Sequence, residues 1–173
     1  MKLEKWIGIL FAVLGSSAWA GDVKSGDWAW NVDDPEIFVA GIENSAGHML
    51  AQFCDPESTN CFYAVGFDTY CEPGHKYPVL VNSDAGSAHL EFICGEKVGD
   101  QHVMVASDFD AMDRLVRQAN HIGFAIPMEG DAFRAVRFSL NGSNDALDAM
   151  REALLVVSNY RPASARQPDA ERF

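Results

Sequence analysis

The chain has 173 residues and a formal net charge of −12, with 25 Asp and Glu residues against 13 Lys and Arg residues. This length is sufficient for one domain with a hydrophobic core of its own. Because a strongly acidic chain repels nucleic-acid phosphates and anionic lipid headgroups, we expect no nucleic-acid partner.

The first twenty residues have the pattern of a secretory signal peptide. Two lysines precede an apolar run at 6–14, and Ala18 and Ala20 stand at the −3 and −1 positions of a cleavage site. The run is too short to span the roughly 30 Å of a membrane's hydrocarbon core as a stable helix. We therefore predict export to the periplasm or out of the cell, with cleavage before Gly21. No later apolar run reaches membrane-spanning length, so we expect no transmembrane segment in the mature chain.

Two tryptophans open the predicted fold, after a small and polar segment at 21–27 that we expect to be a loose entry. Trp28 and Trp30 flank Ala29, so a strand would send both indoles to one face. Buried indoles would begin the core, which is the interpretation we favour. Exposed indoles would instead form an interaction edge.

The chain from 37 to 105 is typical of antiparallel strands separated by turns. Glycine, proline, asparagine, aspartate and serine gather between the apolar runs, as they do in hairpin turns. Leu90, Phe92 and Cys94 share one face of a predicted strand, opposite His89, Glu91 and Ile93, which indicates one face toward a core. The predicted strands are 28–30, 37–42, 49–54, 61–67, 77–82, 88–94 and 102–105.

All four cysteines follow the signal peptide: Cys54, Cys61, Cys71 and Cys94. An even number of cysteines in an exported chain predicts two disulfides, with three possible pairings. We favour Cys54–Cys61 and Cys71–Cys94, because each closes a local loop. A metal site that includes Cys71 and His75 is the alternative, but no Cys-x-x-Cys and no second ligand pair at zinc spacing accompany them.

The hydrophobic period changes after residue 106. Ser107 can cap a helix at 108–120 with an apolar stripe at Met112, Leu115, Val116 and Ala119. Asp108, Asp110 and Asp113 lack the glycine and closing glutamate of a calcium loop, and we interpret them as acidic residues at a helix N-terminal end.

A hairpin of strands 122–126 and 133–140 and a final helix at 144–158 complete the predicted domain. The inner stripe of that helix is predicted to be Leu147, Met150, Leu154 and Val157, with Arg151 and Glu152 outside. The tail at 161–173 is rich in Pro, Ala, Arg and Asp, and we expect it to be disordered.

No catalytic motif stands out along the chain. There is no Gly-x-Ser-x-Gly, His-Glu-x-x-His, phosphate loop or dinucleotide fingerprint, and the five histidines are scattered. We therefore expect no enzymatic activity, no cofactor and no metal. The least favoured alternative is a small cell-wall hydrolase that uses carboxylates such as Asp33, Asp34 or Glu91.

Three segments of the second half carry a family resemblance: DFDAMDRLVRQA at 108–119, FAIP at 124–127 and VRFSLNGS at 136–143, before an Ala- and Leu-containing segment at 144–150. They resemble the invasion-associated locus B family of exported bacterial proteins. The family tends to have a further cysteine soon after the one matching Cys94, and 95–102 has none. The resemblance implies a periplasmic or surface β-sandwich with a non-catalytic role and no defined site residues.

These observations predict a mostly β fold, with a single exported domain at 21–160. We expect an antiparallel β-sandwich with one or two packed helices, and an α+β fold is the alternative. The predicted function is a non-enzymatic periplasmic or secreted binding protein of the bacterial envelope, with a protein partner that is basic. The alternative is a periplasmic inhibitor or immunity protein that blocks a basic toxin or cell-wall hydrolase.

Overall fold

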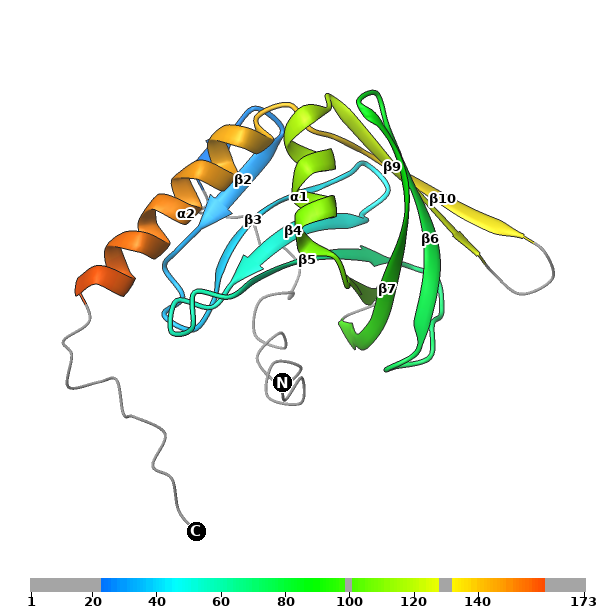
Figure 1. Cartoon of the computed structure of the whole chain (residues 1–173), viewed down its shortest axis with the longest axis horizontal. Coiled ribbons are helices and arrows are strands. Elements are labelled where there is room, and N and C mark those ends of the chain that lie inside the picture. Colours follow the sequence, from blue (N-terminus) through cyan, green and yellow to red (C-terminus); the bar gives the residue numbers. More distant parts are fainter. Residues whose placement is uncertain (1–22, 99–100, 128–131, 161–173) are drawn as a thin grey trace, which may run out of the picture.

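The structure, a computed structural model, describes residues 23–98, 101–127 and 132–160 (Figure 1). The predicted signal peptide and the predicted disordered tail lie outside the described residues. The first strands are β1 (Val23–Ser25), β2 (Trp28–Asn31), β3 (Phe38–Glu43), β4 (Met49–Cys54) and β5 (Cys61–Phe67). They are followed by β6 (Lys76–Ser83), β7 (Gly86–Val98), β8 (Gln101–Ala106), α1 (Phe109–Gln118), β9 (His121–Pro127), β10 (Phe133–Ser139) and α2 (Ser143–Tyr160).

The ten described strands form one sheet in the order β1-β2-β3-β4-β5-β8-β7-β6-β9-β10, and every neighbouring pair is antiparallel. The mostly antiparallel β fold with packed helices is therefore confirmed. The described strands make a single continuous, curved sheet rather than the two separate sheets of a sandwich (Figure 1). The loose entry expected at 21–27 is wrong for Val23–Ser25, which pairs with β2 as an edge strand.

The start of the fold is joined to the end of β10. The indole N–H of Trp28 donates to the carbonyl of Ser139 at 2.9 Å, and the Ser139 hydroxyl lies 2.6 Å from a carboxylate oxygen of Asp27. Gly142 has a φ of +85°, and a Cβ there would lie 1.8 Å from the carbonyl oxygen of Ser25. Only glycine fits this crossing, which brings the two ends of the sheet together.

One large core fills the concave side of the sheet, and both helices pack into it. The helices contribute Met112, Val116, Ala146, Leu147, Met150 and Leu154 to this core. From the sheet, Phe124 packs edge-on against both Phe92 and Phe138, with ring centroids 6.0 Å apart in each pair. Full burial of a Val, Leu, Met or Phe side chain stabilises a fold by about 1.5–3 kcal/mol, so packing of the helices contributes to stability.

Two details of the helices differ from the expectation. Asp108, and not Ser107, caps α1, since its carboxylate accepts the N–H of Ala111 at 2.9 Å, while the Ser107 hydroxyl donates to the carbonyl of Glu91 on β7. Val157 is 45% exposed and does not extend the inner stripe of α2. The last turns of α2 run past the sheet (Figure 1), so the residues there have no core to face.

Candidate interaction surface

The two disulfides have the pairing favoured by the sequence. Cys54 and Cys61 lie opposite each other in register on β4 and β5, with Cα atoms 4.1 Å apart. Cys71 bonds to Cys94 on β7, with Cα atoms 5.9 Å apart, and no free cysteine remains. Both bonds tie neighbouring parts of the chain to the concave core, where Cys54, Cys71 and Cys94 are buried.

A histidine lies beside the second disulfide. Ligand atoms of Cys71, Cys94 and His102 lie within 4.8 Å of one another, and the ring of Tyr70 packs edge-on against His102 at 5.3 Å. The sulfur atoms of Cys71 and Cys94 are joined in a disulfide. Neither cysteine is therefore a thiolate, the form that binds a metal. His75, the alternative ligand suggested by the sequence, lies 3.1 Å from a carboxylate oxygen of Glu72 at the surface.

The two tryptophans share a face as expected, but they do not form an exposed edge. Trp28 is fully buried in the concave core, and Trp30 is half-buried against the same core. Trp28 is therefore not part of an exposed edge, because its indole closes the start of the fold against the end of β10.

The carboxylates considered for a hydrolase do not come together. Asp33 and Asp34 lie between β2 and β3, where the carboxylate of Asp34 accepts the backbone N–H of Glu36 at 2.8 Å. Glu91 lies on β7 and forms an ion pair with Lys76 at 2.7 Å. Strands β4, β5 and β8 separate β3 from β7, which is about 19 Å along the sheet at about 4.8 Å per strand. Paired glycosidase carboxylates lie about 5–10 Å apart.

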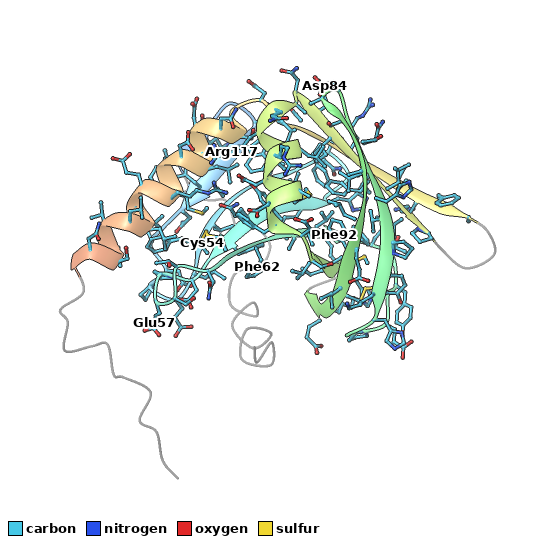
Figure 2. The ribbon with its side chains drawn as sticks, in the orientation of Figure 1. Cys54, Glu57, Phe62, Asp84, Phe92 and Arg117 are labelled. Atoms are coloured by element: carbon cyan, nitrogen blue, oxygen red, sulfur yellow. A yellow bond between two sulfur atoms is a disulfide. The ribbon has the colours of Figure 1, made fainter. Side chains whose placement is uncertain are left out.

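A polar network that the sequence analysis missed joins both helices to the sheet. Asp113 on α1 accepts hydrogen bonds from the hydroxyl of Tyr63 at 2.7 Å and from Arg151 on α2 at 2.6 Å. The Nε of Arg151 also donates to the side-chain oxygen of Gln52 on β4 at 2.8 Å. Arg117 lies between the helices, 3.3 Å from Asp113 and 2.8 Å from Asp148 (Figure 2).

This network moves the pKa values of Tyr63 and Asp113 away from neutrality. Burial raises the pKa of Tyr63 well above its ordinary value, and the hydrogen bond to Asp113 raises it further. Burial alone would raise the pKa of Asp113, but hydrogen bonds from Arg151 and Tyr63 outweigh it and lower that pKa. The network therefore contains an ionised Asp113, a neutral Tyr63 and the guanidinium groups of Arg117 and Arg151.

Two expectations are corrected by this network. The hydrophobic stripe of the last helix predicts Arg151 on its outer face, and the sequence predicts Asp113 with Asp108 and Asp110 at a helix end, whereas both residues lie in the network. The spacing of Asp113 and Arg117, four residues apart on α1, was the available signal for an ion pair. Nothing in the local sequence of β4 marks Gln52 as their partner, because the contact joins segments 99 residues apart.

The convex side of the sheet carries a second apolar cluster. Seven buried residues form it, from β3, β4, β5 and β8 and the residue before β3: Ile37, Val39, Met49, Ala51, Phe53, Ala64 and Val103. Phe53 stacks on Phe62 across β4 and β5, with ring centroids 5.4 Å apart. The buried residues of both helices belong to the other core, so no described helix packs over this cluster. We call these seven residues with Phe62 the convex face.

The segment that builds β2 to β5 is strongly acidic. The segment 25–75, which builds β2 to β5, contains no Lys or Arg and nine acidic residues: Asp27, Asp33, Asp34, Glu36, Glu43, Asp55, Glu57, Asp68 and Glu72. Glu57 lies on the loop between β4 and β5 (Figure 2). An open hollow of about 540 Å³ lies at the edge of these strands and includes Lys24, Asp27, Gly41 and Glu43 in its lining.

Neither helix among the described residues combines the length and apolar character needed to cross a membrane. No family model matches the chain, and no curated protein is significantly similar to it. Among solved structures, the chain is similar to invasion-associated protein B from Bartonella henselae, with 15% sequence identity and a TM-score of 0.57. The match covers 76% of this chain and 96% of that chain, so it extends well beyond the segments at 108–150 that carry the sequence resemblance. This likeness shows that the two proteins share a fold.

Proposed function

We propose that this chain is a non-enzymatic, exported binding protein of the bacterial envelope, in the periplasm or outside the cell. The observation that carries the proposal is the acidic segment 25–75, which has nine Asp and Glu residues and no Lys or Arg, in a fold shared with invasion-associated protein B. A segment with one sign of charge attracts partners of the opposite charge and repels those of the same charge. The two disulfides and the shared fold with an invasion-associated protein support an exported location.

The chemistry of the polar network favours binding over catalysis. A general acid or base works best when its pKa lies near the operating pH. Here the pKa of Asp113 is lowered and that of Tyr63 is raised, so both move away from neutrality. Their contacts join α1, α2 and the sheet, which is a structural role.

The experiment for this proposal is photo-crosslinking in the native envelope. A photoreactive phenylalanine analogue replaces Phe62 on the convex face, and the matched control carries it at Phe133, which is 71% exposed on β10. We expect a protein adduct from position 62 and none from position 133. Equal adducts from both positions, or none from position 62, would contradict a binding role for the segment 25–75. Turnover of cell-wall material by the purified protein would overturn the non-enzymatic assignment.

A second candidate is an inhibitor or immunity protein that blocks a basic toxin or hydrolase. The unbroken acidic character of 25–75 favours it, because opposite charge speeds association and selects partners. Its test is the activity of a cationic cell-wall hydrolase with increasing amounts of the purified protein. Stoichiometric inhibition that disappears at high salt would support this candidate, and full activity at saturation would exclude that hydrolase as the target.

A further inference from the structure

We propose that the open hollow beside β1 binds a basic amino-acid residue through its side-chain cation and its α-carboxylate, as free lysine or arginine or as the C-terminal residue of a peptide. The inference rests on the proposed binding function, because most of the hollow is built by the acidic segment 25–75. It identifies a site within that segment and the chemistry of the ligand.

The hollow lies at the corner where the first strands of the sheet meet the end of β10. Its volume of about 540 Å³ falls in the range of small-molecule sites, about 300–1,000 Å³. On one side, the N–H of Asp27 donates to the carbonyl of Asn141 at 3.0 Å. On the other, the side-chain amide of Asn44 donates to the carbonyl of Arg137 at 3.1 Å. These bonds hold the walls together, so a ligand would not have to order the chain there.

The floor of the hollow is made of small residues. Lys24 on β1 lies opposite Ala29 on β2, and Ala29 lies opposite Gly41 on β3. A Cβ at Gly41 would lie 2.5 Å from the Cβ of Ala51, so a larger residue would displace the next strand. Opposite side chains in a sheet lie on the same face, so Lys24 borders a strip with one methyl group and one bare backbone. This strip leaves the space for a ligand.

Charged groups of both signs border this floor. Lys24 lies at its β1 end, and the register between β2 and β3, continued by two residues, places Asp27 beside Glu43. The hydroxyl of Ser139 donates to the carboxylate of Asp27 at 2.6 Å, which fixes that group. Among the described residues, Lys24 and Glu43 form no ion pair, so the charges of a ligand would displace none.

This charge pattern selects the ligand. Asp27 and Glu43 can share the N–H donors of one ammonium or guanidinium group, and Lys24 can bind a carboxylate. Strands β1 and β3 are two strand spacings apart, about 10 Å, so the cation and the anion of the ligand need the separation that a Lys or Arg side chain provides.

Other ligands fit the pattern less well. An acidic amino acid would bring a second anion toward Asp27 and Glu43, and a diamine would bring a cation toward Lys24 without an anion to pair with it. A divalent cation is not favoured, because no third metal-ligating side chain joins the two carboxylates within the part of the chain that the structure describes.

The test is isothermal titration calorimetry on the exported, disulfide-bonded protein at about 20 mM salt, where exposed charges are little screened. The probes are lysine, norleucine, which lacks the side-chain ammonium, and cadaverine, which lacks the carboxylate. We expect lysine to bind about fivefold or more tightly than either control, because each control loses one charged contact. Lysine that binds no more tightly than norleucine, or that does not bind at about 20 mM, would overturn the inference.

Substitutions locate the site. Glu43→Gln removes one carboxylate of the hollow, and Glu152→Gln makes the same change at an exposed position on α2. We expect Glu43→Gln to weaken lysine binding about threefold or more, and Glu152→Gln to leave it unchanged. Lys24→Gln should weaken the binding of lysine but not that of cadaverine. Equal effects of Glu43→Gln and Glu152→Gln would contradict the proposed site.

Two peptides distinguish the sources of this chemistry. Gly-Gly-Lys ends in a carboxylate, and its C-terminal amide does not. Tighter binding of Gly-Gly-Lys than of free lysine would support a peptide end as the ligand, and the reverse would support the free amino acid. Equal binding of Gly-Gly-Lys and its amide, with no binding of free lysine, would overturn the role of the carboxylate.

Two outcomes separate this inference from the proposed function. A protein adduct from position 62, together with no lysine binding, would refute the ligand site and leave the proposed function standing. Lysine binding that depends on Glu43, without an adduct from position 62, would support the ligand site and contradict the protein-binding role.

Discussion

Arg151 on α2 donates a hydrogen bond from Nη2 to Oδ1 of Asp113 on α1 at 2.6 Å, and the same guanidinium lies 5.6 Å above the ring centroid of Phe109. Arg151 follows Leu147 by four residues, so both lie on the side of α2 that meets the core. The guanidinium therefore joins the two helices instead of facing solvent.

Removal of this guanidinium should destabilise the protein. Arg151→Ala deletes charged hydrogen bonds to Asp113 and Gln52, and we expect a loss of about 1.5–3 kcal/mol in the free energy of unfolding by urea titration. Glu152→Ala, at the exposed neighbouring position, should change it by less than about 0.5 kcal/mol. Equal losses from the two variants would mean that the network contributes nothing.

Stability should fall in acid because two carboxyl groups have lowered pKa values. Asp113 is held by Arg151 and Tyr63, and Asp84 accepts the backbone N–H groups of His121 and Asn120. A lowered folded-state pKa stabilises the protein fully above the ordinary pKa of about 3.9, and this contribution is lost as the pH falls toward the folded-state value.

The measurement for the acid prediction is the free energy of unfolding from about pH 7 down to about pH 2.5. Asp113→Asn should be less stable than the parent at neutral pH, and the difference should shrink below about pH 4. A difference that stays constant across the whole range would show that ionisation of Asp113 does not stabilise the fold.

Substitutions at two adjacent leucines on α2 test which side of the helix packs against the concave core. Leu154 is buried in the concave core, whereas Leu155 is 60% exposed. Leu154→Ala should cost about 2–5 kcal/mol through lost burial and the cavity left behind. Leu155→Ala should cost less than about 0.5 kcal/mol. Chemical denaturation of both variants measures the contrast, and similar midpoints would contradict this packing.

The two disulfides should differ in their contribution to stability. Loop-closure entropy predicts about 2.5 kcal/mol for Cys54–Cys61 and about 3.4 kcal/mol for Cys71–Cys94, because their sequence separations are 7 and 23. Two variants, each with both cysteines of one disulfide replaced by Ser, can be compared by thermal unfolding. The variant that lacks Cys71–Cys94 should have the lower unfolding midpoint. The reverse order would show that local packing outweighs chain entropy.

Patterns within single elements were sufficient to predict most of the strands and both helices. Alternation in β7 identified Leu90, Phe92 and Cys94 as core residues, because a strand sends every second side chain to one face. The short edge strand β1 was missed, since Val23–Ser25 has little apolar pattern and is defined by its pairing with β2.

The amino-acid sequence by itself determined the secondary-structure pattern, the favoured disulfide pairing and the acidic character of 25–75, because these depend on neighbours along the chain. Only the tertiary structure decided that one curved sheet forms, that Trp28 is buried, and that Arg151 meets Asp113 and Gln52. It also decided that Val39, Phe53 and Val103 gather on one convex face. Such contacts join residues far apart in sequence, so no local periodicity encodes them.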